Sequence, residues 1–595
     1  MRWTEDQLKA INEEGTNIII SAGAGSGKTA VLTERVLRKL QSGVDITSLL
    51  VLTFTNAAAA SMKKKIRNKV KEEKDLKDQL ELIDSAYICT FDSFSLSLVK
   101  KYHTYLNITN NIEITDKMIV DLEKKNILNE ILEEKYSNPT DSFKLLINNF
   151  CLKDDDKLID YLLNIYGKIE LKYNKEEYLN NYLNNNFNNE IIDEYLNDYL
   201  KLIISHIENM NIIMNDIKSS FDGKVYTKIY DSVSNILDLR DYDLIKLHSN
   251  IELPRINKYD NEYQKSLRAS LKQEIDVIKE LCIYESLDEA KQELLSTKSN
   301  LEEIINILIE LHNRLTNYKN DNNIYNFTDI AHMAIKIVKE NDDIREELKN
   351  SFNEILIDEY QDTSDTQEEF ISLISNNNVY MVGDIKQSIY RFRNANPYIF
   401  KDKYDLYRDT DEGIKIDLLK NFRSRKEVLE NINDIFNKVM NDEIGGADYI
   451  SSHNMVFGNL SYDKEGKKDN NYLEVINYTE EDKKYSSSEY EAFLIAKDIQ
   501  NKVNSKTQIF DKDNKVLRNS NYSDYCIMID RSKDFELYKK IFTYFGIPLT
   551  IERDKTLTDD NDILVISNLI KLIIFIKQGI IENNFIHSFI SVARS

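Results

Sequence analysis

Short apolar runs alternate with longer amphipathic stretches along much of the chain. Apolar runs bounded by polar residues predict buried strands at residues 18–20, 49–53, 354–357, 379–382 and 525–529. Strands of this kind, separated by helices, are typical of a parallel sheet that is covered on both faces. We therefore predict an α/β fold with a parallel sheet and flanking helices.

The region between the first two and the last three of these strands contains few helix breakers. After Gly43 the next glycines are Gly167, Gly223 and Gly383, and apolar residues recur there at helical spacing. We therefore predict that a large helical insertion, at residues 116–325, interrupts the α/β core.

The composition is that of a soluble globular protein, with 30% charged and 42% hydrophobic residues. On a prior of about 150 residues per domain, 595 residues suggest about four domains or large subdomains. Lys and Arg total 78 against 101 Asp and Glu, which gives a net charge of −23. This charge excludes a protein that coats nucleic acid by bulk attraction, but it leaves room for a local basic groove.

No segment of the sequence predicts a membrane span or a secretory signal. The most apolar stretch, residues 563–576, is interrupted by Asn568 and Lys571, and it predicts a buried amphipathic helix. The four cysteines are scattered, as expected of reduced thiols, so we expect a cytoplasmic protein.

A glycine-rich segment at residues 21–29 follows the first predicted strand and precedes a predicted helix. In this context glycines allow backbone N–H groups to turn toward phosphate oxygens, and the helix N-terminus adds its dipole. Lys28 would neutralise phosphate charge, and the Thr29 hydroxyl would ligate Mg²⁺. The expected nucleotide contacts are Ala22, Gly23, Ala24, Gly25, Ser26, Gly27, Lys28 and Thr29.

Asp358 and Glu359 follow the predicted strand at residues 354–357. Asp358 can hold hydrated Mg²⁺, and Glu359 can orient and deprotonate an attacking water. An acidic pair alone would more often be a solvated turn, but together with the phosphate loop it predicts ATP and Mg²⁺ as cofactors. The basic run at residues 63–69 is either a solvated helix face or a contact with a nucleic-acid backbone, and its position after the second strand favours the contact.

Further segments, in order along the chain, resemble the motifs of superfamily 1 DNA helicases, the UvrD/PcrA/Rep/RecB/AddA group. The matching segments are residues 3–7 (Q motif), 52–59 (motif Ia), 89–94 (motif Ib), 358–363 (motif II), 382–393 (motif III), 419–424 (motif IV) and 546–553 (motif IVa). In motif Ib, Asp92 stands where many relatives carry His.

The resemblance implies roles for residues at matching positions. Gln7 would read the adenine, Phe422 would stack on it, Gln387 would sense the γ-phosphate, and Arg423 would reach the γ-phosphate from a second lobe as an arginine finger. Aromatic side chains would stack on single-stranded bases, although lobe core is the alternative for them. The DNA contacts expected in this way are Phe54, Thr55, Asn56, Lys63, Tyr390, Phe392 and Arg393.

The resemblance also implies the domain organisation. The expected parts are residues 1–115 and 326–405 (first RecA-like lobe), 116–325 (helical insertion) and 406–595 (second RecA-like lobe, incomplete). Motifs V and VI and a nuclease domain are not found up to residue 595. We expect the chain to be the N-terminal half of a larger protein.

Motif III is most similar to that of the AddA branch, which combines helicase and nuclease. That branch implies a 3′–5′ helicase of double-strand-break repair that acts, together with an AddB-type subunit, on single-stranded and duplex-end DNA. The alternatives are a repair helicase of the UvrD/PcrA/Rep type, and a nucleotide- and DNA-binding fragment without turnover.

Overall fold

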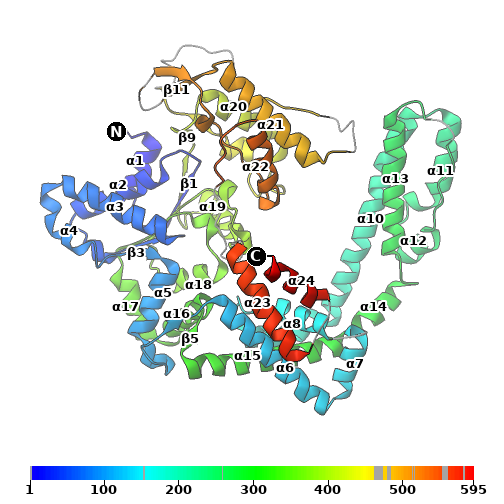
Figure 1. The fold of residues 1–595 in the computed structure, drawn as a ribbon, viewed down its shortest axis with the longest axis horizontal. Helices are drawn as coiled ribbons and strands as arrows, with labels where there is room; N and C mark the ends of the chain where they lie inside the picture. The colour runs from blue at the N-terminus through cyan, green and yellow to red at the C-terminus, as the bar shows by residue number, and fades with distance from the viewer. Residues whose placement is uncertain are drawn as a thin grey trace. The chain divides into compact units, whose positions relative to one another are not determined.

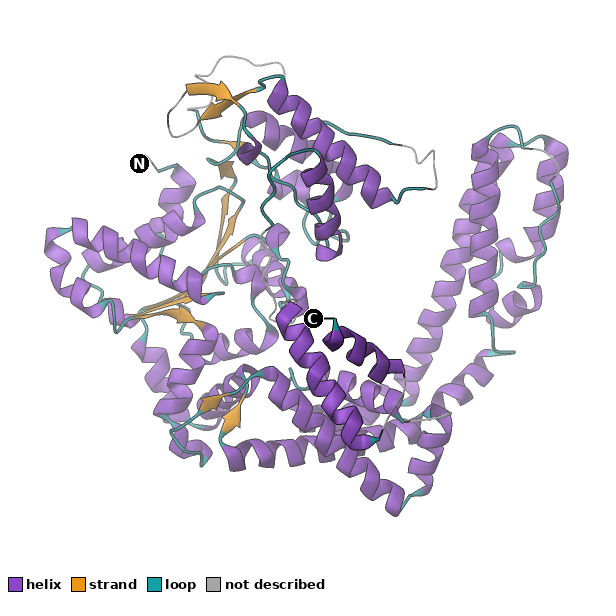
Figure 2. Cartoon of the chain, in the orientation of Figure 1, coloured by secondary structure: helices purple, strands orange, loops and turns teal. Residues whose placement is uncertain are grey.

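The computed structural model describes residues 3–151, 155–256, 259–460, 473–478, 484–511, 514, 516–551, 561–579 and 583–594. The chain divides into two compact units, Met1–Asn459 and Leu460–Ser595, which are described separately. Figure 1 labels the elements along the chain, and Figure 2 distinguishes helices from strands.

A six-stranded parallel sheet forms the centre of the first unit. Its strand order is β3-β2-β6-β7-β1-β8, and every neighbouring pair is parallel. The strands are β1 (Ile18–Ala22), β2 (Leu49–Thr53), β3 (Tyr87–Thr90), β6 (Glu354–Ile357), β7 (Val379–Gly383) and β8 (Ile414–Leu418). The four strands predicted in this unit are confirmed, and their carboxyl ends lie at one edge of the sheet.

Helices cover both faces of this sheet. Alternation along the strands directs side chains to opposite faces: Ile355 and Ile357 belong to one core, whereas Leu356 belongs to the other. The Leu356 face is covered by α1 (Glu5–Asn12), α2 (Lys28–Gln41), α3 (Asn56–Glu72) and α4 (Lys77–Leu82). The opposite face is covered by α5 (Phe91–Lys101), α16 (Phe327–Glu340), α17 (Asp342–Ser351), α18 (Asp365–Ile374) and α19 (Pro397–Asp409).

The strand β8 corrects the expected end of the first lobe. We expected that lobe to end at residue 405, but Ile414–Leu418 pairs with β1 in the same sheet. Only Ile416 and Leu418 are buried, because β8 is the edge strand. An edge strand alternates apolar and polar residues, so it lacks the continuous apolar run by which the other strands were recognised.

The inserted region begins and ends at a small parallel pair of strands, β4 (Glu113–Ile114) and β5 (Ile324–Tyr325). Between them the described chain is helical. The helices are α6 (Lys117–Ser137), α7 (Asp141–Phe150), α8 (Asp156–Ile169), α9 (Lys175–Asn186), α10 (Asn189–Ser220), α11 (Gly223–Leu237), α12 (Tyr242–His248), α13 (Glu262–Leu281), α14 (Leu287–Ser296) and α15 (Lys298–Asn322). They build two separate hydrophobic cores, one from α6–α9 with α15 and one from α10–α13.

Buried ion pairs attach the base of this insertion to the α/β core. Lys319 at the end of α15 lies 2.8 Å from Asp329 of α16 and 3.5 Å from Glu170. Glu170, which follows α8, also pairs with Lys124 of α6 at 2.5 Å. Four segments that are distant in sequence are therefore joined at one buried point.

Three further elements close the first unit: β9 (Lys420–Asn421), α20 (Lys426–Val439) and β10 (Val456–Phe457). The second unit contains α21 (Ser487–Asn504), β11 (Gln508–Asp511), β12 (Val516–Asn519), α22 (Phe535–Tyr544), α23 (Asn561–Gln578) and α24 (Asn583–Ala593). Among its described residues β11 and β12 pair antiparallel and no parallel sheet is present, so a second RecA-like lobe stays a prediction. The predicted motif IVa falls partly outside the described residues.

Two expectations for the second unit are wrong. Residues 525–529 are extended, and Tyr525, Ile527 and Ile529 pack on α21 and α22, but no described strand pairs with them. The helix expected at residues 563–576 is present as α23, yet it is not buried, since Ile570 is 53% exposed. Apolar content alone does not reveal whether a helix has a packing partner. No helix within the described ranges is long and apolar enough to cross a membrane.

The buried ion pair between Arg35 of α2 and Glu354 of β6 supplies a test of the fold. The two side chains form two hydrogen bonds, of 2.5 and 2.9 Å, and Arg35 is 0% exposed. The guanidinium also donates to the carbonyl oxygens of Ala10 and Ile11, so it joins α1 to the sheet.

We expect Arg35→Met to lower the free energy of unfolding by about 3–5 kcal/mol, because Glu354 would remain buried without this partner. Chemical denaturation measures the change. The matched control is Arg345→Met, which removes an exposed pair with Asp342 and should cost at most about 1 kcal/mol. Equal effects of the two substitutions would contradict this role of Arg35.

Candidate functional site

The glycine-rich loop lies between β1 and α2 at the carboxyl edge of the sheet. Gly25 and Gly27 have φ of +71° and +90°, which side chains with a Cβ rarely adopt. Gln7 of α1 donates through Nε2 to the Ser26 carbonyl at 2.9 Å, and its Oε1 accepts from the Thr4 backbone N–H at 3.0 Å. The Gln7 side chain therefore holds the loop from the α1 side.

Two observations show that this loop fits a phosphate chain. The Ser26 hydroxyl is buried and has no hydrogen-bond partner among the described residues. Helix α2 begins after Gly27 without a side chain to cap it, so its first N–H groups remain available to an anion. Lys28 and Thr29 form the first turn of α2, in the positions expected for a phosphate-neutralising amine and a Mg²⁺ ligand.

The segment after β9 contacts this loop directly. Asn421 donates through Nδ2 to the Ala24 carbonyl at 2.6 Å, and the Phe422 N–H donates to the Gly25 carbonyl at 2.9 Å. A Cβ placed on Gly25 would lie 2.8 Å from both Arg423 Cβ and Asn421 Nδ2. Arg423 therefore lies beside the phosphate loop within the first unit, whereas we expected it on a separate second lobe.

Phe422 has a defined packing partner. A Cβ on Gly458 would lie 2.8 Å from the Phe422 ring, and the Asn459 amide donates to the Phe422 carbonyl at 3.1 Å. The absence of a side chain at Gly458 therefore gives the ring its space. Stacking of this ring on adenine stays a prediction. Sequence reasoning quoted Asn421 within motif IV but assigned it no role, and only its contact with the loop reveals one.

The acidic pair lies at the end of β6, opposite Lys28. The Lys28 ammonium is 2.8 Å from Glu359 Oε2. Burial, together with the neighbouring Glu359 charge and against the Lys28 charge, raises the pKa of Asp358 to about 6. Glu359 has a φ of +53°, a strained conformation for a residue other than glycine and one that often marks a functional site.

Gln361 connects this acidic pair to motif III. It is buried, it donates through Nε2 to Glu359 at 2.9 Å and to Asp362 at 3.2 Å, and its Oε1 accepts from the Asp384 N–H at 2.9 Å. Asp384 in turn accepts from Gln387 Nε2 at 2.7 Å. Contacts therefore continue from the phosphate loop through Glu359 and Gln361 to Gln387, the expected γ-phosphate sensor. Sequence reasoning missed Gln361, because a glutamine inside a motif carries no signal of its own.

The expected DNA-stacking residues lie together on the adjoining surface. The rings of Phe54 and Tyr390 stack at 4.7 Å, and Tyr390 lies 5.9 Å from Phe392. The Arg393 guanidinium lies within 6.0 Å of all three ring centroids. Phe392 is 77% exposed, so lobe core is not its role. Two segments that are distant in sequence thus build one aromatic–basic cluster.

The other expected DNA contacts have local partners. Thr55 caps α3 by accepting from the Ala58 N–H at 3.1 Å, and Asn56 accepts from the Thr90 hydroxyl at 3.5 Å. Lys63 donates to the Asp84 carbonyl oxygen at 3.2 Å and lies 3.4 Å from its carboxylate, with which Arg67 also pairs. Asp84 therefore neutralises part of the basic run at residues 63–69. A contact of Lys63 with DNA phosphate stays a prediction.

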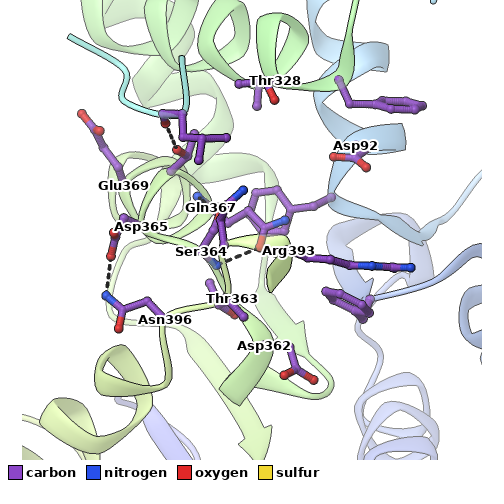
Figure 3. Close-up of a pocket in the computed structure, with 18 of the residues that line it drawn as sticks. Asp92, Thr328, Asp362, Thr363, Ser364, Asp365, Gln367, Glu369, Arg393 and Asn396 are labelled. Atoms are coloured by element: carbon purple, nitrogen blue, oxygen red, sulfur yellow. Dashed lines mark hydrogen bonds between the residues drawn. The ribbon is translucent and has the colours of Figure 1, made fainter. Parts of the chain in front are cut away.

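A cavity of about 1000 Å³ lies between this cluster and the acidic pair. It is lined by the carboxyl ends of β2, β3 and β6, by the segment after β7, and by residues 168–178 of the insertion. Figure 3 shows Asp92, Arg393, Asp362 and Asn396 around this space. The nucleotide-side carboxylates and the aromatic–basic cluster thus contribute to the walls of one cavity.

Comparison with known proteins agrees with this geometry. The model of the UvrD/REP helicase N-terminal domain matches residues 3–408, more than half of the chain. The chain belongs to the UvrD/REP helicase family. The loop at residues 21–29 and the acidic pair Asp358–Glu359 lie within the matched domain, whereas Arg423 lies beyond it.

Curated relatives cover more of the chain. An ATP-dependent helicase/nuclease subunit, of the type designated A, from Clostridium botulinum (strain Alaska E43 / Type E3) is 30% identical over 96% of this chain and 52% of its own length. Its counterpart from Bacillus cytotoxicus is 29% identical over 96% of this chain and 50% of its own, and that from Thermoanaerobacter sp. (strain X514) is 32% identical over 77% and 41%. The chain spans about half the length of the curated relatives it matches.

The close approach at Gly25 yields a prediction with a matched control. Gly25 and Gly15 both have positive φ, but a Cβ on Gly15 meets nothing within 4 Å. Both alanine variants should therefore lose about 1–2 kcal/mol of stability from backbone strain. Only Gly25→Ala should also displace Asn421 and Arg423, and weaken ATP binding about tenfold or more, as expected when a hydrogen bond to a charged group is lost. Titration with a fluorescent ATP analogue measures this, and equal affinities of the two variants would contradict the assignment.

Proposed function

We propose that the chain carries the ATP-driven motor of a 3′–5′ DNA helicase that acts in double-strand-break repair and recombination. Its cofactors would be ATP and Mg²⁺, and its substrates single-stranded and duplex-end DNA. The relatives are named helicase/nuclease subunits, so we further propose that the motor is part of such a protein, works in the cytoplasm, and pairs with an AddB-type subunit.

The observation that carries this proposal is the hydrogen-bonded connection between the phosphate loop and motif III. It continues from Lys28 through Glu359, Gln361 and Asp384 to Gln387. The aromatic–basic cluster around Tyr390 begins only a few residues after Gln387. A change at the phosphate end would therefore reach the DNA-facing side chains through a short and rigid path.

The roles of the ATP-site residues follow from their positions. Lys28, now paired with Glu359, would turn to the β- and γ-phosphates, and Mg²⁺ would be held by Thr29 and Asp358 and supply charge neutralisation. Glu359, released from Lys28, would accept a proton from the attacking water. Arg423 beside Gly25 would stabilise charge on the γ-phosphate, and Gln387 would report whether that phosphate is present.

The aromatic–basic cluster would hold the DNA strand. Exposed rings provide faces on which successive bases of any sequence can stack, and Arg393 adds a cation for the backbone. This arrangement explains how a chain of net charge −23 can bind DNA, because attraction is confined to one surface.

The first test is ATP hydrolysis by the complete gene product with and without single-stranded DNA. We expect stimulation by DNA in the wild type, and a loss of about 10²- to 10⁴-fold in hydrolysis rate in Glu359→Gln with ATP binding retained, because the general base is removed. Glu347→Gln, which changes an exposed acid paired with Lys101, is the control. A wild-type rate that does not respond to DNA would refute the proposed function.

The second test separates stacking from charge in the aromatic–basic cluster. Phe392→Ala should weaken single-strand binding about five- to 150-fold, the range for one stacked base, with little change in salt dependence. Arg393→Ala should reduce the slope of log K against log salt by about 0.7, the value for one single-strand phosphate.

Titrations of both variants at several salt concentrations decide this test. Tyr105→Ala, which removes another exposed ring of the first unit, should bind like the wild type. If both cluster variants also bind like the wild type, the DNA path lies elsewhere on the protein.

A further inference from the structure

The large cavity has a second wall that comes from the helical insertion. The segment between α8 and α9 is fixed to the α/β core, because the Leu171 carbonyl accepts from the Thr366 hydroxyl at 3.2 Å and lies 3.3 Å from His332 Nε2. The cavity is therefore enclosed by built structure on both sides.

Cations line both of these walls. Lys168 and Lys172 belong to the insertion wall, and Arg391 and Arg393 belong to the wall formed by the segment after β7. The Lys172 ammonium lies 4.6 Å from the centre of the Tyr178 ring, so this wall also combines charge with an aromatic face. A strand whose phosphates lie against these side chains would turn its bases into the space between them.

Asp92 is the exceptional acid of this cavity. It lies in the first turn of α5 and points into the cavity (Figure 3). It does not cap that helix, because the Ser93 N–H donates to the Thr90 hydroxyl instead. Burial raises the pKa of Asp92, and no charged group offsets this effect.

The other acids that line the cavity have hydrogen-bond donors. Asp365 accepts from Asn396 Nδ2 at 2.7 Å, as Figure 3 shows, and Glu369 accepts from Lys339 Nζ at 3.0 Å. Asp358, Glu359 and Asp362 accept from the Glu359 N–H, Lys28 and Gln361, respectively. Within the described part of the chain, the Asp92 carboxylate has neither a donor nor an ion-pair partner. Its acceptor oxygens are therefore left for a ligand.

The chemistry of a carboxylate limits what this ligand can be. An ionised carboxylate only accepts hydrogen bonds, so it repels phosphate and requires N–H or O–H donors. Along a DNA strand the strongest donors are on the bases. Guanine offers N1–H and the N2 amino group side by side, cytosine and adenine offer one amino group, and thymine offers a single N3–H.

We propose that Asp92 reads a base of the bound single strand in this cavity, accepting hydrogen bonds from its amino edge, with guanine preferred over thymine. The inference rests on the proposed function, since it requires a single strand in the cavity. It adds a specificity-determining residue to a path that is otherwise indifferent to sequence, because stacking and phosphate contacts carry no base information.

Three oligonucleotides of equal length test this proposal. They are a thymidine homopolymer, the same oligomer with deoxyguanosine at alternate positions, and that oligomer with deoxyinosine in place of deoxyguanosine, which lacks only the N2 amino group. Fluorescence anisotropy on the complete gene product should show that wild type binds the guanine oligomer about fivefold or more tightly than the inosine oligomer, the lower end of the range for a bidentate pair. Asp92→Asn and Asp92→Ala should abolish that difference and leave binding of the thymidine oligomer unchanged.

The control and the contrary outcomes are equally defined. Asp75→Asn, an exposed acid of the same unit, should keep the wild-type difference. Equal affinities of the wild type for the three oligomers would overturn the inference while leaving the proposed function intact, and so would an Asp92→Asn variant that loses all three oligomers equally. A wild type that binds none of the three would instead refute the proposed function.

Discussion

Parallel pairing of six strands is the constraint on which the rest of the first unit depends. Since the strands all run in one direction, their carboxyl ends meet at a single edge, and the loops that leave them are forced together. The loop after β1, the acidic pair after β6 and the segment that follows β7 are brought to that edge in this way. Both faces of the sheet are covered by helices, so this edge is where polar and charged side chains can converge.

Buried hydrogen bonds then convert proximity into coupling. Gln361 uses its amide to join Glu359, Asp362 and Asp384, and Gly383 leaves room for it, since a Cβ there would lie 2.6 Å from Gln361 Oε1. Such a group is costly to leave unpaired, so the side chains around it must move together or not at all. This is a physical basis for transmitting the state of the nucleotide site to a DNA-facing surface.

The helical insertion contributes to the site as well as to the bulk of the chain. Its base is joined to the core by Lys319, Glu170 and Asp329, and this junction holds the segment that forms the second wall of the cavity. An open sheet edge becomes an enclosed space with cations on two sides. Within that space the unpaired Asp92 differs from every other lining acid.

Local sequence signals were sufficient to predict the strands at residues 18–20, 49–53, 354–357 and 379–382 and the chemistry of their loops. They were sufficient because a fully buried strand is a continuous apolar run and a phosphate loop needs glycines followed by Lys28. Features that depend on packing partners emerged only from the folded chain. The fold places the alternating strand β8 in the first sheet, leaves the apolar helix α23 exposed, and pairs Lys63 with Asp84. It also gives Gln361, Asn421 and Asp92 their roles, since whether a polar side chain has a donor within reach depends on segments that can lie hundreds of residues away.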